Sequence, residues 1–274
     1  MKIGLALPSF VEDPEVPVTV ARVAEAHGMD GVFVYDHLFR TARGGALRPA
    51  IECGVLAGSV AAATSRIGIG TLVARATLRP PATLAAMLDT VARIAGPRLF
   101  AGVGAGDEES RVEMETFGFD FGTEAQRVGA LRATVRGLTS RGYPVWVAGR
   151  ARHVGVVAAE RADGWNRWGV DVARFARELG EVRDLVERLR GFADDFVPSW
   201  GGLVVVAATD LDAASKAARL AAGPGTLVGS PETVAAALRA YAAAGAQWAV
   251  LAPVDADDPE NAEILGELVR PRLA

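Results

Sequence analysis

The residues best suited to acid–base chemistry are a histidine and two carboxylates near the ends of short apolar runs. His37 follows Asp36 directly after the apolar run 31–35, and Asp107 follows a glycine-rich turn. An imidazole can take or give a proton near neutral pH, and a carboxyl group can act as an acid when its surroundings disfavour the charged form. The residue types therefore predict proton transfer at His37, with Asp107 as a second acid or an orienting group. A purely structural histidine, bonded to a neighbouring loop, fits the position of His37 equally well.

Two glycine-containing turns are candidates for binding a ligand through the backbone. The segment 102–107 lacks the last glycine of a dinucleotide-binding loop, and no lysine follows it as in a phosphate-binding loop. It is either a tight turn or a wall that lets a flat ring approach the backbone at Gly104 and Gly106. The turn 148–150 precedes a helical pattern, so it is either a plain connection or a phosphate site built from the first N–H groups of that helix.

Composition excludes several classes of protein. The 274 residues are 50% hydrophobic and 23% charged, with a net charge of −4, which argues against a disordered chain and against a general binder of nucleic acid or anionic membranes. Cys53 is the only cysteine, and the three histidines are scattered, so we expect no disulfide and no metal site. The apolar runs are too short for a signal peptide or a membrane span. We expect a cytoplasmic protein with a small-molecule substrate.

Short apolar runs alternate with helical patterns along the whole chain. The expected strands are 3–7, 31–35, 66–73, 98–103, 145–147, 164–166, 203–207 and 248–251. The expected helices are 17–27, 50–63, 81–95, 124–138, 152–160, 172–189, 211–221, 231–244 and 261–269. Eight strand–helix units in about 250 residues predict a single (β/α)8 TIM barrel domain over 1–274, with an open doubly wound sheet as the alternative. A barrel would place the site at the carboxyl ends of its strands.

Several ordered segments carry a further signal. They read GVFVYDHLF at 31–39, TSRIGIGT at 64–71, RPPATLA at 79–85, RLFAGVGAG at 98–106, VWVAG at 145–149, ADGWN at 162–166 and VGSPE at 228–232. Together they resemble the luciferase-like flavin- and F420-dependent oxidoreductases over nearly the whole chain. The resemblance implies a (β/α)8 barrel that binds FMN or coenzyme F420 at its carboxyl-end face, and commonly a homodimer.

The resemblance also implies a role for each candidate residue. His37 matches a histidine that serves as a base in F420-dependent sugar-phosphate dehydrogenases, and Asp107 falls where those enzymes have an acidic residue. A non-proline cis peptide in the third strand supports the ring in F420-dependent members, and the equivalent bond here joins Leu72 to Val73. The residues implied in cofactor binding are Asp36, Leu72, Val73, Gly104, Gly106, Ala148, Gly149 and Arg150.

Two departures from the family pattern concern the cover of the site. The segment 138–144 leads directly into the fifth strand, where members usually have a long excursion, and the glutamate common in the helix after the fourth strand is missing near Gly129. Three interpretations stay open: an F420-dependent oxidoreductase, an FMN-dependent monooxygenase, and a cofactor-binding barrel without catalysis. The monooxygenase would need a water-excluded pocket. The Asp36–His37 pair and an arginine- and alanine-rich composition, typical of GC-rich bacterial genomes, favour F420.

Overall fold

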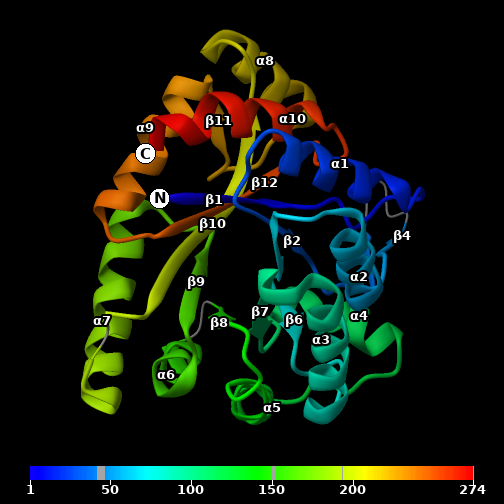
Figure 1. The fold of residues 1–274 in the computed structure, drawn as a ribbon, viewed down its shortest axis with the longest axis vertical. Coiled ribbons are helices and arrows are strands. Elements are labelled where there is room, and N and C mark those ends of the chain that lie inside the picture. The colour runs from blue at the N-terminus through cyan, green and yellow to red at the C-terminus, as the bar shows by residue number, and fades with distance from the viewer. Residues whose placement is uncertain (42–46, 150–151, 193, 274) are drawn as a thin grey trace.

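Eight parallel strands form a closed barrel in the computed structural model, which describes residues 1–41, 47–149, 152–192 and 194–273 (Figure 1). The barrel strands are β1 (Lys2–Ala6), β2 (Gly31–Val34), β5 (Gly68–Thr71), β7 (Leu99–Gly104), β8 (Val145–Ala148), β9 (Gly164–Trp168), β10 (Val197–Val206) and β12 (Trp248–Pro253). Each pairs with the next along this series, and β12 pairs with β1 to close the ring. The predicted (β/α)8 barrel is confirmed.

The helices surround this ring (Figure 1). They are α1 (Glu15–Ala26), α2 (Cys53–Ala63), α3 (Pro81–Ala95), α4 (Arg111–Thr116), α5 (Glu124–Leu138), α6 (Arg152–Arg161), α7 (Val172–Arg190), α8 (Asp210–Leu220), α9 (Pro231–Ala243) and α10 (Glu260–Ile264), which continues as a π turn to Val269. The N- and C-terminal ends lie side by side, and the Met1 amino group donates to the Leu273 carbonyl. Only six residues, 139–144, join α5 to β8, as the sequence predicts.

Local signals explain why several helices begin where predicted. Thr123 and Gln126 form a capping box at the start of α5, and the Ser230 side chain accepts a hydrogen bond from the backbone N–H of Thr233 at the start of α9. Proline occupies the first position of α3 and of α9, where its missing N–H costs nothing. The observed starts of α3 and α5 agree with the prediction because of these local signals, and their ends agree as well.

Two strands differ most from their predicted limits. β10 begins at Val197 rather than at residue 203, because Gly201 and Gly202 interrupt the apolar run that the prediction relied on. A Cβ atom at either glycine would overlap a tryptophan ring, so these glycines make room for aromatic packing inside a continuous strand. β5 is shorter than predicted and ends at Thr71.

Four short strands were not predicted, because each contains only two or three residues. They are β3 (Phe39–Thr41), β4 (Leu47–Pro49), β6 (Ala74–Arg75) and β11 (Leu227–Gly229). β3 and β4 form an antiparallel hairpin, whereas β6 pairs in parallel with the carboxyl end of β7.

The inside of the barrel is filled by aromatic rings. Phe33, Phe100, Trp146 and Trp248 pack with ring centroids 5.3–6.4 Å apart. Glycines on neighbouring strands leave space for these rings, so the barrel needs both residue types together. The same cluster reaches Tyr35, Leu72 and Trp168 at the carboxyl ends of the strands. A larger aliphatic layer fills the space between strands and helices.

Candidate active site

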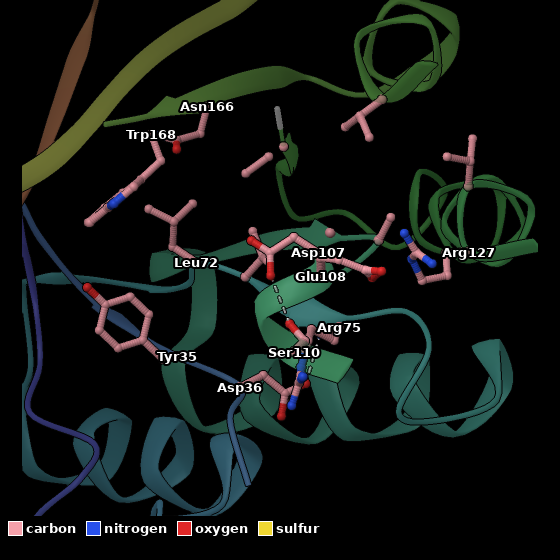
Figure 2. A pocket seen from close by; sticks show the side chains of 18 of the residues that line it. Tyr35, Asp36, Leu72, Arg75, Asp107, Glu108, Ser110, Arg127, Asn166 and Trp168 are labelled. Atoms are coloured by element: carbon pink, nitrogen blue, oxygen red, sulfur yellow. Dashed lines mark hydrogen bonds between the residues drawn. The ribbon is translucent and has the colours of Figure 1, made fainter. Parts of the chain in front are cut away.

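A cavity of about 530 Å³ opens at the carboxyl ends of the barrel strands (Figure 2). Nine of the ten predicted site residues line it: Asp36, His37, Leu72, Val73, Gly104, Gly106, Asp107, Ala148 and Gly149. The tenth, Arg150, lies outside the described residues. The fold therefore brings these nine residues to one place, and their roles stay predictions.

The two ends of the cavity differ in character. Figure 2 shows Tyr35 and Trp168 at one end, with their rings nearly perpendicular and their centroids 6.3 Å apart. Arg127 lies at the opposite end, and Asp107 and Glu108 lie between the two ends. A ligand that fills the cavity would therefore meet aromatic surface at one end and charged groups from the middle to the other end.

The wall between these ends is built from β5, β6 and β7. The Leu72–Val73 peptide bond is cis, as the resemblance implied. A Cβ atom at Gly104 would lie 2.5 Å from Cγ2 of Val73 and 3.2 Å from the carbonyl oxygen of Ala148. Glycine at position 104 lets β7 approach both the Leu72–Val73 connection and β8. The wall is therefore largely backbone and small side chains.

His37 is held by a carboxylate that the sequence analysis did not identify. Its Nδ1 lies 2.8 Å from Oε1 of Glu113 on α4, and Oε2 of the same carboxylate accepts a hydrogen bond of 2.8 Å from the Leu38 backbone N–H. Glu113 is thus bound to two successive residues of the segment after β2. The His37 side chain is 40% exposed, whereas the Glu113 side chain is 5% exposed. The pairing fixes the imidazole at the edge of the cavity, and within the described residues no hydrogen bond engages Nε2.

A buried arginine completes this group. Nη1 of Arg75 lies 2.7 Å from Oε1 of Glu113, the same oxygen that contacts His37. Burial by itself would raise the pKa of the Glu113 carboxyl, but the hydrogen bonds from His37 and Leu38 and the charges of His37 and Arg75 together hold that pKa below its usual value. Glu113 is therefore a carboxylate at neutral pH.

Asp36 is not the partner of His37. Its Oδ2 accepts hydrogen bonds from the Arg75 backbone N–H at 2.8 Å and from Nη1 of Arg79 at 2.7 Å. Arg79 also contacts Glu52, and these two carboxylates raise its pKa against the opposing effect of burial. Although Asp36 and His37 are adjacent in sequence, Asp36 braces the β6 segment while His37 contacts α4.

Three other residues differ from or extend the prediction. Asp107 is exposed at the rim, and its Oδ1 accepts a hydrogen bond from the Ser110 hydroxyl at 3.1 Å. Arg167, at the end of β9, pairs with Glu178 on α7 and is buried outside the cavity. Trp168, the next residue, lines the cavity.

Asn166 offers a polar group that sequence reasoning left without a role. It is fully buried on the cavity wall, and its amide nitrogen donates to the Ser199 hydroxyl at 2.9 Å. Its Oδ1 has no hydrogen-bond partner within the described chain. A buried carbonyl oxygen without a partner is costly, so a donor from a ligand would be favourable here.

Neither of the remaining histidines lines the cavity. His27 follows α1 and contacts Glu267, and His153 on α6 contacts Glu124. In the part of the chain that the structure describes, no three His, Cys, Asp or Glu residues are arranged to hold a metal ion. None of the described helices combines the length and apolar character needed to cross a bilayer. The oligomeric state stays a prediction.

Comparisons with solved structures agree with the fold. An F420-dependent secondary alcohol dehydrogenase, in complex with an F420–acetone adduct, superimposes with a TM-score of 0.82 at 15% identity, covering 100% of this chain and 99% of that one. An EDTA monooxygenase from Chelativorans sp. BNC1 superimposes with a TM-score of 0.81 at 15% identity, covering 100% and 93%. At such low identity the likeness shows the (β/α)8 fold alone.

Comparisons of sequence identify the family. A protein of Mycobacterium tuberculosis is 28% identical over 163 residues, and the match covers 51% of this chain. The chain thus spans about half (56%) of the length of the curated relatives it matches. The model of the luciferase-like monooxygenase family matches residues 1–143, which is more than half of the 274 residues. The chain therefore belongs to the luciferase-like monooxygenase family.

Proposed function

We propose that this enzyme uses coenzyme F420 to move a hydride to or from a small organic substrate, with His37 moving the accompanying proton. One observation carries the proposal. The His37 imidazole is fixed through Nδ1 by the buried Glu113 carboxylate and stands on the wall of a cavity large enough for a cofactor. This arrangement suits a base whose free nitrogen must meet a substrate in one orientation.

The residues of the cavity fit a flat ring with polar edges. Leu72, Val73 and Gly104 supply a wall of backbone and small side chains, and Asn166 supplies a buried acceptor for a ring N–H. Gly149 lies before α6, where backbone N–H groups favour a phosphate group. Bound F420 would supply a two-electron hydride carrier that does not activate oxygen.

The geometry assigns the proton to one imidazole nitrogen. Because the Glu113 carboxylate can only accept, the neutral His37 ring donates from Nδ1 and keeps its lone pair on Nε2. In substrate oxidation Nε2 accepts the proton of a hydroxyl group as the hydride leaves the carbon. In the reverse direction the protonated ring returns that proton to the oxygen formed from a carbonyl group. His37 is therefore the catalytic residue of the proposal.

The exposure of His37 favours hydride transfer over oxygen chemistry. Its side chain is 40% exposed at the cavity, and the short connection 139–144 enters β8 at the opposite end of the barrel, so it does not cover the site. A monooxygenase must exclude water to protect its reactive oxygen species, whereas hydride transfer from a deazaflavin does not depend on that protection. The FMN-dependent monooxygenase is the alternative that the following test can establish.

Titration of the purified protein with F420 and with FMN separately, followed by fluorescence quenching, tests the proposal. We expect F420 to bind more tightly than FMN. A panel of small alcohols and the matching carbonyl compounds, followed by deazaflavin absorbance, then searches for turnover. Tighter FMN binding together with oxygen consumption by the reduced flavin would replace the proposal with the monooxygenase. Binding of neither cofactor would overturn both and support a barrel without this catalysis.

A further inference from the structure

We propose that Arg75 is a positioning residue that sets the pH range in which His37 works as a base. The inference rests on the proposed function for its catalytic meaning, but the effect on His37 itself is independent of any cofactor. Arg75 lies on β6, one of the short strands that the sequence did not predict, and its side chain is 3% exposed. Nothing in the sequence patterns pointed to it as a partner of His37.

Arg75 and His37 share one oxygen atom. Oε1 of Glu113 is 2.7 Å from Nη1 of Arg75 and 2.8 Å from Nδ1 of His37, while Oε2 is occupied by the Leu38 backbone N–H. The carboxylate can therefore not turn away from the imidazole without losing the arginine and the backbone. The positive charge of the Arg75 guanidinium also offsets part of the attraction between the Glu113 carboxylate and a protonated imidazole.

The buried charges around His37 balance only when Arg75 is present. Arg75 and Arg79 carry two positive charges, and Asp36 and Glu113 carry two negative charges. All four side chains are at most 17% exposed, so solvent screens them weakly. With the four in place, the imidazole faces a nearly neutral group. Loss of Arg75 would leave a net negative charge that favours the protonated imidazole.

Other groups near His37 would not compensate for the loss of the positive charge of Arg75. The rings of Phe10 and Tyr35 pack against the imidazole and carry no charge at neutral pH. Arg40 is exposed and lies over Phe10, and Arg79 reaches on to Glu52. The remaining charged side chains that line the same cavity and that the structure describes are Asp107, Glu108, Glu124 and Arg127. Asp107, Glu108 and Glu124 are exposed to water, and Arg127 lies toward the far end of the cavity (Figure 2).

The contact uses only part of the guanidinium. Nε and Nη2 of Arg75 have no hydrogen-bond partner in the described part of the chain. Arg75 therefore acts on Glu113 through one N–H group, on Nη1, and through its positive charge. A lysine could supply both, since its ammonium group is a point charge with rotatable donors. Charge, and not the planar shape of arginine, should therefore decide the effect.

Histidine NMR tests this without a cofactor or substrate. The chain has three histidines, so the imidazole signals can be assigned with His37→Gln and followed from acid to neutral pH. We expect Arg75→Met to raise the midpoint of the His37 titration by about one pH unit. Arg75→Lys should keep the native midpoint. Arg111→Met is the matched control, because it removes an exposed arginine from α4, the helix that carries Glu113.

The outcomes separate this inference from the proposed function. An unchanged His37 midpoint in Arg75→Met, or an equal shift in Arg111→Met, would overturn the role of Arg75. If Arg75→Met does not fold, Arg75→Gln removes the same charge and retains an N–H donor. With F420 and an oxidisable substrate, the acid limb of kcat/KM should move to higher pH in parallel with the NMR midpoint. A shifted midpoint in a protein that turns nothing over would support Arg75 and refute the F420 activity.

Discussion

Two histidine–glutamate pairs at opposite ends of the barrel have nearly the same geometry and very different surroundings. His37 and Glu113 lie 2.8 Å apart at the cavity, and His27 and Glu267 lie 2.7 Å apart beyond the end of α1. The Glu113 side chain is 5% exposed, whereas that of Glu267 is 54% exposed. The distance between the two groups therefore does not distinguish a candidate catalytic pair from a surface pair.

The carboxylate explains the difference. Glu113 accepts hydrogen bonds from His37, Arg75 and the Leu38 backbone, so it has one position and holds the imidazole in one tautomer. Glu267 lies in solvent, where an ion pair with His27 is screened and contributes about 0–1 kcal/mol. A histidine works as a directed base when its partner is itself fixed.

Removing each imidazole should give the largest contrast between the two pairs. We expect His37→Ala to lower kcat of the F420-dependent reaction by about 10²- to 10⁴-fold, because general base catalysis is lost. His27→Ala should keep native turnover. Cofactor titration of both variants checks that His37→Ala still binds F420. Native turnover by His37→Ala would refute the base assignment.

Removing the charge of each carboxylate should give a smaller contrast. We expect Glu113→Gln to lower turnover by about 10- to 100-fold and stability by about 1.5–3 kcal/mol, because a buried arginine loses its charged partner. Glu267→Gln should change stability by less than about 0.5 kcal/mol. Urea unfolding and steady-state kinetics measure the two effects. Equal destabilisation by both changes would mean that the burial of Glu113 is unimportant.

Acid should remove part of the stability that Glu113 provides. Its pKa is held below the ordinary value of 4.5, so its contribution is full above that value and is lost as the pH falls through the folded-state pKa. We expect the difference in Tm between the native protein and Glu113→Gln to be constant near neutral pH and to shrink below about pH 4.5. Thermal unfolding of both proteins between about pH 3 and pH 7 measures this difference in Tm. A difference that stays constant down to the acid end would contradict the lowered pKa.

The fold was predictable because its signals are local. Apolar runs, proline at helix starts and side-chain caps each act within a few residues, which is why α3 and α5 agree at both ends. β10 was shortened in the prediction because Gly201 and Gly202 resemble a turn in sequence. Only the packing of tryptophan rings against them, which the sequence does not display, explains a strand there.

The site was predictable only in part, for the same reason. Strand ends located the residues that line the cavity, because the barrel fixes where those ends meet. The pairing inside the site was missed, since His37 and Glu113 are 76 positions apart and Asp36 stood nearer in sequence. The signal that could have found Glu113 was a carboxylate in the first short helix after the glycine-rich strand end.

The smallest effect is expected at Asp107, the other residue predicted to move a proton. Its side chain lies in solvent at the cavity rim and is bonded only to the Ser110 hydroxyl within the described chain, so it lacks the burial and the fixed partners of Glu113. We expect Asp107→Asn to lower kcat/KM by less than about fivefold, as for the loss of one exposed, screened interaction. Steady-state kinetics beside Glu113→Gln measures the ratio. A loss at Asp107 as large as at His37 would show that the rim carboxylate, and not the buried pair alone, takes part in proton transfer.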